Sequence, residues 1–157
     1  MDCYIGIDPG ATGAMAVIAT GVGAPMVYDF GHSKILPQMG HISRAERAHA
    51  VIEKAGAMPK QGVSSTFKFG VNYGWWQGVL DAYGIPYDFV TPAKWRRVMF
   101  DSMSKDDPKA MSLDRARRLF PKMAEQLSRK KDHGRAEALL LAEYCRRSII
   151  IEDVVGQ

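Results

Sequence analysis

Three short β-rich segments separated by tight turns occupy the first thirty residues, and this pattern constrains the fold most. Residues 3–8 alternate in character and stop at Pro9-Gly10, residues 13–20 form a second such segment, and residues 25–30 follow a turn at 21–24. Strands joined by connections this short pair antiparallel. The sequence therefore predicts an antiparallel meander at the start of the chain.

The rest of the chain alternates between helical and strand patterns. Thr91-Pro92 is a strong helix start, because a capping hydroxyl precedes a proline. In the middle of the chain the pattern predicts a loop at 31–42, a short helix at 43–48 with Glu46 in a capping box, a strand at 49–55, and a loop at 56–65. A helix at 69–83, a strand at 85–90 and a helix from 91 to about 100 follow. The last third is predicted to contain a polar loop at 102–108, a basic helix at 112–120, a turn or two at 122–127, a charged loop at 128–134 and a helix from 135 to about 148. We expect an α/β fold with a five-stranded mixed sheet flanked by helices.

Length and composition fit one cytoplasmic domain. A chain of 157 residues suits a single domain, and no apolar run is long enough to span a membrane. The start of the chain lacks the pattern of a signal peptide. Two cysteines do not make a disulfide framework, which fits a reducing compartment.

Charge is distributed unevenly along the chain. Residues 94–135 contain 13 basic and 6 acidic residues, a net charge of +7, whereas the remainder carries a net charge of −3. A basic segment of this kind indicates a polyanionic partner. A solvated surface rich in lysine and arginine would give the same composition. Motifs are therefore needed to distinguish a polyanion-binding surface from a merely solvated one.

Acidic residues fall at the ends of two predicted strands. Asp8 ends the first strand and Glu53 lies at the corresponding end of the fourth, so the two carboxylates would be roughly 5 Å apart if the strands are neighbours. His133 and Glu137 are spaced i, i+4 at the final helix and share a face. Such a group suits Mg²⁺ or Mn²⁺, and two ions could hydrolyse a phosphodiester. Each feature alone also fits a turn, a solvated strand end or a surface pair, so the prediction depends on their joint occurrence.

Four blocks of sequence together resemble the RuvC family of Holliday junction resolvases, in the branch that contains the plant chloroplast resolvase and its bacterial and phage relatives. They follow the family's order from Gly6 to about Tyr144. The blocks are GIDPGATGA from Gly6, Glu53 followed by MPKQGVSS from Met58, TPAKW from Thr91, and KKDHGRAEA from Lys130.

The resemblance implies an RNase H-like nuclease domain spanning residues 1–157, a homodimer, and symmetric nicking of two like strands of a four-way DNA junction. Carried over position by position, Asp8, Glu53, His133 and Glu137 form the catalytic and metal-binding quartet. It would hold two Mg²⁺ ions, with Mn²⁺ as a substitute and no small-molecule cofactor. Asp132 rivals His133 as a ligand, although the i, i+4 spacing to Glu137 favours His133. The expected location is the cytoplasm of a bacterial cell or a phage-infected host, away from membranes.

Junction binding requires contacts to phosphates and to bases. Basic residues that flank the proposed site are expected to bind phosphates, and they are Lys94, Arg129, Lys130, Lys131 and Arg135. In the segment after Glu53, Ser64 and Ser65 can donate to phosphate, Lys60 and Gln61 can reach base edges, and Phe67 can stack on an opened base.

Two alternatives stay open. RuvC-like nucleases that process ribosomal RNA precursors share the Asp-Pro-Gly start, and a catalytically silent module could recognise branched DNA without cutting it. The intact acidic quartet argues against the silent module.

Overall fold

The computed structural model of the chain describes residues 1–56, 62–101 and 107–155. The strands and helices of this part are β1 (Asp2–Asp8), β2 (Ala14–Ala19), β3 (Met26–Asp29), α1 (His32–Ile42), β4 (Arg47–Glu53), α2 (Val63–Ala82), β5 (Tyr87–Val90), α3 (Pro92–Met99), α4 (Pro108–Leu119), the short 3₁₀ turns η1 (Pro121–Met123), η2 (Glu125–Leu127) and η3 (Lys130–Asp132), and α5 (His133–Val155).

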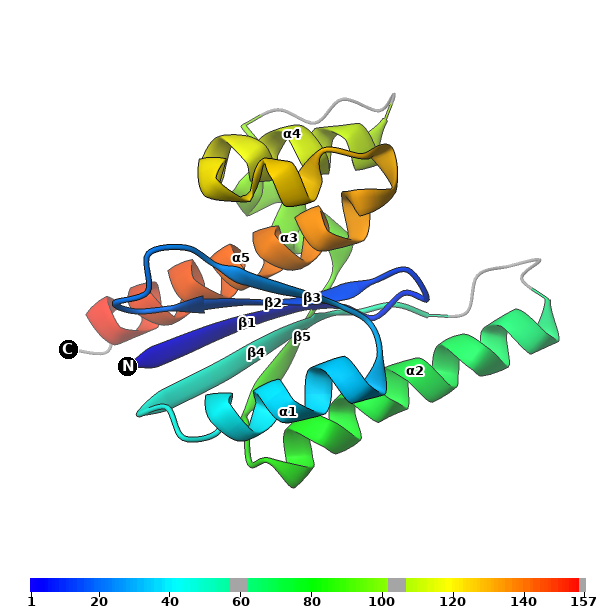
Figure 1. The fold of residues 1–157 in the computed structure, drawn as a ribbon, viewed down its shortest axis with the longest axis horizontal. Helices are drawn as coiled ribbons and strands as arrows, with labels where there is room; N and C mark the ends of the chain where they lie inside the picture. Colours follow the sequence, from blue (N-terminus) through cyan, green and yellow to red (C-terminus); the bar gives the residue numbers. More distant parts are fainter. Residues whose placement is uncertain (57–61, 102–106, 156–157) are drawn as a thin grey trace.

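A mixed sheet lies between two layers of helices (Figure 1). Its strand order is β3-β2-β1-β4-β5, with β1 antiparallel to β2 and parallel to β4. Helices α1 and α2 cover one face, and α3, α4 and α5 cover the other. The predicted five-stranded α/β fold with an antiparallel start is confirmed.

The side chains of β1 alternate between two buried cores. Ile5 and Ile7 belong to the core beneath α1 and α2, whereas Tyr4 belongs to the core beneath α5. Because successive side chains of a strand point to opposite faces, Asp8 lies on the α5 face with Tyr4.

The same alternation orients β4. Val51 belongs to the core beneath α5, and Ile52 belongs to the opposite core. Glu53, two residues beyond Val51, therefore lies on the α5 face at the end of the strand. Because β1 and β4 are parallel, with Ile7 paired to Ile52, the last residues of both strands lie at one edge.

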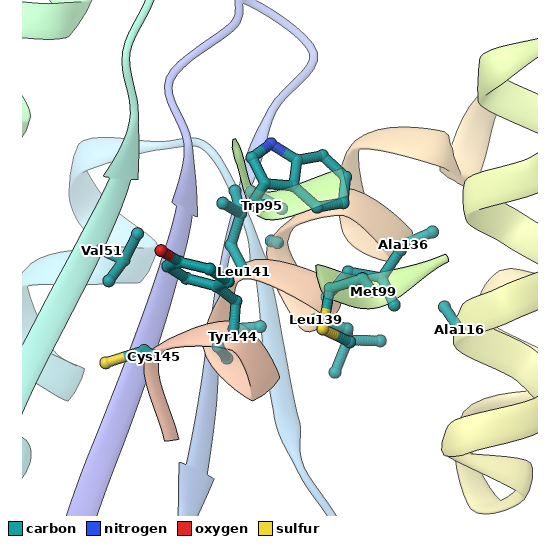
Figure 2. Close-up of a cluster of buried hydrophobic side chains, with 14 of the residues drawn as sticks. Val51, Trp95, Met99, Ala116, Ala136, Leu139, Leu141, Tyr144 and Cys145 are labelled. Carbon is teal, nitrogen blue, oxygen red and sulfur yellow. The ribbon is translucent and has the colours of Figure 1, made fainter. Parts of the chain in front are cut away.

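Helix α5 packs directly on the central strand. A Cβ atom at Gly6 would lie 2.2 Å from both the carbonyl oxygen of Ala138 and the amide nitrogen of Ala142. Leu139, Leu141 and other apolar side chains of α5 fill the surrounding core (Figure 2). The absence of a side chain at position 6 is thus what permits the helix to approach this closely.

The predicted loop at 31–42 is wrong, because this segment forms α1. Ile35, Met39 and Ile42 are buried on one side of it at helical spacing. The helix forms with Gly31 at its N-cap position and Pro37 inside it. Burial of the apolar face outweighs the hydrogen bond that proline cannot donate.

The short helix predicted at 43–48 is also wrong, since residues 43–46 form a turn and β4 begins at Arg47. Glu46 does not close a capping box. Its carboxylate instead lies 2.6 Å from the amino group of Met1, and the backbone amide of Glu46 donates to the carbonyl of Met1. Pairing with the edge of β1 thus competes successfully with local helix formation.

Other boundaries shift by a few residues. The strand predicted at 49–55 spans Arg47–Glu53, α2 begins at Val63, six residues earlier than expected, and α5 begins at His133. Ser64 and Ser65 therefore lie in the first turn of a helix, whereas a loop was predicted at 56–65. Thr91 caps α3 as predicted, accepting a hydrogen bond from the amide of Lys94.

Replacing Gly6 by alanine should destabilise the fold. The added methyl collides with backbone atoms of α5, which can move only with the whole helix, so we expect the free energy of unfolding to fall by roughly 3 kcal/mol, the upper end of the range for overpacked cores. Urea denaturation followed by circular dichroism measures this change.

The control is Gly78→Ala in α2, where an added Cβ has open space. That substitution should stabilise by about 0.4 to 1 kcal/mol, because alanine lowers the entropy of the unfolded chain. Equal effects of the two substitutions would contradict the close packing of α5 on β1.

Candidate active site

Asp8 is held at the end of β1 by the turn that follows. The amide of Gly10 donates to Oδ1 of Asp8 over 3.0 Å. Burial raises the pKa of Asp8, while the Gly10 hydrogen bond and the nearby charges of His133 and Arg96 act in the opposite direction. The side chain is thus oriented, half-buried and close to the first turn of α5.

Glu53 receives a hydrogen bond from α3. The indole Nε1 of Trp95 donates to Oε2 of Glu53 over 2.6 Å. Burial raises the pKa of Glu53 and the negative charge of Asp8 raises it further, while the Trp95 hydrogen bond and Arg96 lower it. Glu53 and Asp8 therefore act on each other electrostatically, as expected for neighbouring strand ends.

His133 is brought to this edge by the close approach of α5. A Cβ atom at Gly134 would lie 2.3 Å from the carbonyl oxygen of Thr12, so the first turn of the helix touches the turn after β1. His133 is partly exposed, with Nδ1 3.4 Å from the carbonyl oxygen of Lys130, and its charge acts on Asp8.

Asp132, the rival ligand, is committed elsewhere. It is buried and accepts hydrogen bonds from the backbone and the guanidinium of Arg129, with Arg135 3.9 Å away. These contacts lower its pKa. This arrangement supports the choice of His133, which itself stays a prediction.

Glu137 lies one helical turn after His133 and is buried. Arg96 of α3 and Ser112 of α4 contact its Oε1 over 3.1 and 3.4 Å. Burial and the negative charges of Asp8 and Glu53 raise the pKa of Glu137 to about 7, although Arg96 and Ser112 act against the rise. Glu137 is thus a buried carboxyl that repels two others.

These side chains share one electrostatic environment without forming a finished chelate. Among the described residues, no three histidine, cysteine, aspartate or glutamate side chains are gathered as a metal-binding group. The carboxylates of Glu53 and Glu137 are instead held by Trp95, Arg96 and Ser112. The donor types still fit Mg²⁺ or Mn²⁺, since carboxylate oxygens and an imidazole are suitable ligands and a cation would relieve the repulsion.

The predicted DNA-binding residues fall into three groups. Lys94, Lys130, Lys131, Ser64, Ser65 and Phe67 are exposed. Arg129 is paired with Asp132, and Arg135 is paired with Asp29, both of its contacts to that carboxylate being 2.6 Å. Lys60 and Gln61 lie outside the described residues. The exposed group therefore has its polar and aromatic atoms available, whereas the two arginines already serve the fold.

Sequence reasoning missed the supporting roles of α3 and α4. In the sequence Trp95 ends the TPAKW block, Arg96 follows it, and Ser112 begins the helix predicted at 112–120, and none of these patterns indicates a contact with a carboxylate. Each contacts a site carboxylate that lies 25 to 42 residues away in the chain. The TPAKW block was the available signal, because it places an aromatic donor near a cap-defined helix start.

Comparison with solved structures defines the fold class. Thermus thermophilus RuvC in complex with a Holliday junction substrate superposes with a TM-score of 0.57 at 16% identity, covering 92% of this chain and 94% of that chain. Another T. thermophilus RuvC structure gives a TM-score of 0.50 at 19% identity, covering 92% and 95%. The chain therefore has the RNase H-like fold of RuvC.

A curated relative gives a more particular likeness. The chloroplastic Holliday junction resolvase MOC1 of Chlamydomonas reinhardtii is 29% identical over 124 residues, which cover 78% of this chain. The match spans 14% of that protein's length. No protein-family model matches the chain. The resemblance to RuvC-type resolvases that the motifs predicted is confirmed.

Glu137 predicts that the cation-free protein loses stability between about pH 4.5 and pH 7. Its folded pKa of about 7 lies above its ordinary 4.5, so in this window the folded chain keeps a proton that the unfolded chain releases. The stabilising contribution is complete below the lower value and lost as the pH rises through the upper one. In EDTA at about pH 8, Glu137→Gln should therefore melt at a higher temperature than the parent, with the difference nearly gone at about pH 4.

Glu143 on the same helix is the matched control. It is also buried, but hydrogen bonds from Arg146 and Arg147 outweigh burial and lower its pKa. Glu143→Gln should therefore reduce the melting temperature near neutral pH. Parallel pH profiles for both variants would contradict the charge repulsion at Glu137.

Proposed function

We propose that this chain is a metal-dependent endodeoxyribonuclease that resolves four-way DNA junctions by paired nicks on like strands. One observation carries the proposal: Asp8 and Glu53, at the adjoining ends of parallel strands, face the helix that bears His133 and Glu137, within a RuvC fold. The MOC1 relative is named as a Holliday junction resolvase, and the RuvC structure is a complex with a Holliday junction, so both support a junction as the substrate.

The quartet has the chemistry that phosphodiester hydrolysis requires. Asp8, Glu53, His133 and Glu137 would hold the cations, whose binding requires Glu137 to release its proton. Divalent ions bound there would supply activation of a water molecule and charge stabilisation at the departing 3′ oxygen. We take Mg²⁺ as the ion and Mn²⁺ as its substitute, two per site.

The surroundings of the quartet offer groups for DNA. Lys94 lies in the first turn of α3, next to Trp95, and Lys130 and Lys131 lie in the turn η3 that precedes α5, so three exposed lysines are close in sequence to residues of the site. The first turns of α2 extend past the end of the sheet (Figure 1), and Phe67 on this helix is 72% exposed. An exposed phenylalanine in this position suits stacking on a base.

A homodimer would match the symmetry of the substrate. A four-way junction has near two-fold symmetry, and an isologous dimer would present one catalytic site to each of two like strands. We propose the dimer on these grounds.

The cellular location stays a prediction. In the part of the chain that the structure describes, no helix has the length and hydropathy that a membrane crossing demands. The MOC1 relative is named as chloroplastic, so the expected cytoplasmic location is not carried over from it.

The proposal is tested by incubating the protein with an end-labelled four-way junction, a linear duplex and a structured RNA, with Mg²⁺ or with EDTA. We expect paired, Mg²⁺-dependent nicks in the junction alone. Cleavage of the RNA instead would favour a ribosomal RNA processing role, and tight junction binding without cleavage would favour the silent module.

Asp8→Asn separates binding from cleavage in the same assay. Cleavage should fall by more than about 100-fold, because loss of a direct ligand should exceed the 10- to 100-fold cost of losing an outer partner. Junction binding in EDTA should be retained, because it depends on phosphate contacts. A folded Asp8→Asn protein that fails to bind would refute this division.

Lys130→Ala combined with Lys131→Ala should weaken junction binding and flatten its salt dependence. Each phosphate contact contributes roughly 0.9 to the slope of log affinity against log salt, so two lost contacts lower the slope by about 1.8. Fluorescence anisotropy at several salt concentrations measures both quantities.

Lys122→Ala is the matched control. Lys122 donates to the carbonyl of Gly23, which follows the C-terminal end of β2. That end of β2 pairs with the start of β1, so Lys122 lies at the opposite edge of the sheet from Asp8. A slope that falls equally in this control would contradict the proposed surface.

A further inference from the structure

Helix α3 contributes one neutral hydrogen-bond donor to a carboxylate of the site, and this donor is the indole of Trp95. Its ring is fully buried, and Nε1 donates to Oε2 of Glu53 over 2.6 Å. Figure 2 shows the ring at the rim of the buried cluster, with its nitrogen turned away from Leu141 and Tyr144. The apolar part of Trp95 is thus anchored in the core while its polar atom reaches the site.

The ring has little freedom to move. Thr91 caps α3 and Pro92 begins it, which fixes the start of the helix. Met99, one turn later, is buried in the same cluster, and the guanidinium of Arg96 lies 5.1 Å from the ring centroid. A side chain with two torsions, packed on these sides, holds its N–H in one direction.

Burial of an indole does not by itself demand such a bond in this protein. Trp76, on α2 in the opposite core, is equally buried, and its Nε1 has no hydrogen-bond partner among the described residues. The Trp95 bond is, in contrast, short and made to a carboxylate, and bonds to ionised acceptors are about twice as strong as neutral ones. The contact therefore acts on Glu53 as well as satisfying the indole.

We propose that Trp95 is a positioning residue for Glu53, its indole N–H fixing one carboxylate oxygen so that the other stays available to the divalent cation. The inference rests on the proposed function, because it assigns Glu53 a cation to bind. Without the indole, Glu53 would lose a directional restraint and its carboxylate would sample several orientations, which lowers affinity for the ion.

Trp95→Phe tests the proposal, since it keeps an aromatic ring in the core and removes the N–H. Mn²⁺ binding, measured by isothermal titration calorimetry near pH 8, should weaken by roughly 10- to 100-fold, the usual cost of removing an outer partner of a metal ligand. Trp76→Phe, which removes a buried indole without a partner, should bind Mn²⁺ as the parent does. Unchanged Mn²⁺ affinity in a folded Trp95→Phe protein would overturn the proposal, as would equal losses in both variants.

A second measurement observes the unaltered protein, and variants serve only to assign its indole signals. In ¹H–¹⁵N spectra, with indole signals assigned from single Trp→Phe variants, the Trp95 N–H should shift when Mg²⁺ is added, because its acceptor then binds the ion. The Trp76 signal should stay in place. A Trp95 signal that does not move at saturating Mg²⁺ would also overturn the proposal.

Failure of the proposed function has a separate signature. If the parent protein binds neither Mn²⁺ nor Mg²⁺, the metal-dependent nuclease is refuted together with the inference. If the parent binds and cleaves while Trp95→Phe does both equally well, only the role of Trp95 is refuted.

Discussion

The backbone contact between α5 and β1 is the constraint on which the rest of this structure depends. At Gly6 the helix approaches the strand so closely that no side chain fits between them. That approach fixes the height and direction of α5 above the sheet, and with them the positions of His133 and Glu137 relative to the end of β1. His133 and Glu137 lie near the ends of β1 and β4 only because the distance between the helix layer and the sheet is this short.

The site that results concentrates like charges where the protein gains no stability from them. Burial raises the pKa of Asp8, Glu53 and Glu137. The charge of Asp8 also raises the pKa of Glu53, and the charges of Asp8 and Glu53 raise that of Glu137, while Arg96 lowers all three. Glu143, farther along the same helix, shows the alternative, because two arginines fully pair it. A buried carboxylate can thus be stabilised in this fold. At Glu137, in contrast, burial and the neighbouring negative charges outweigh the contacts from Arg96 and Ser112, which favours binding of a proton or a cation.

The sequence allowed prediction of features that arise from neighbouring residues. The antiparallel meander follows from short turns, the start of α3 from Thr91-Pro92, and the edge location of Asp8 and Glu53 from strand ends. Helix α1 was missed because Gly31 and Pro37 are local loop signals that tertiary burial overrides. The hydrogen bond from Trp95 to Glu53 joins residues 42 positions apart, and no local pattern encodes a partner at that distance.

The close contact between Gly134 and Thr12 restricts which residues can occupy position 134 but does not restrict position 133. Any larger residue at 134 would lift the first turn of α5 from the sheet, whereas its neighbour at 133 is partly exposed and free of that restriction. With His133 as the proposed ligand, exchange of imidazole for carboxylate at 133 would alter the preferred ion while the scaffold stayed the same. Relatives of this chain could therefore diversify in metal usage through one side chain, without redesigning the helix that carries it.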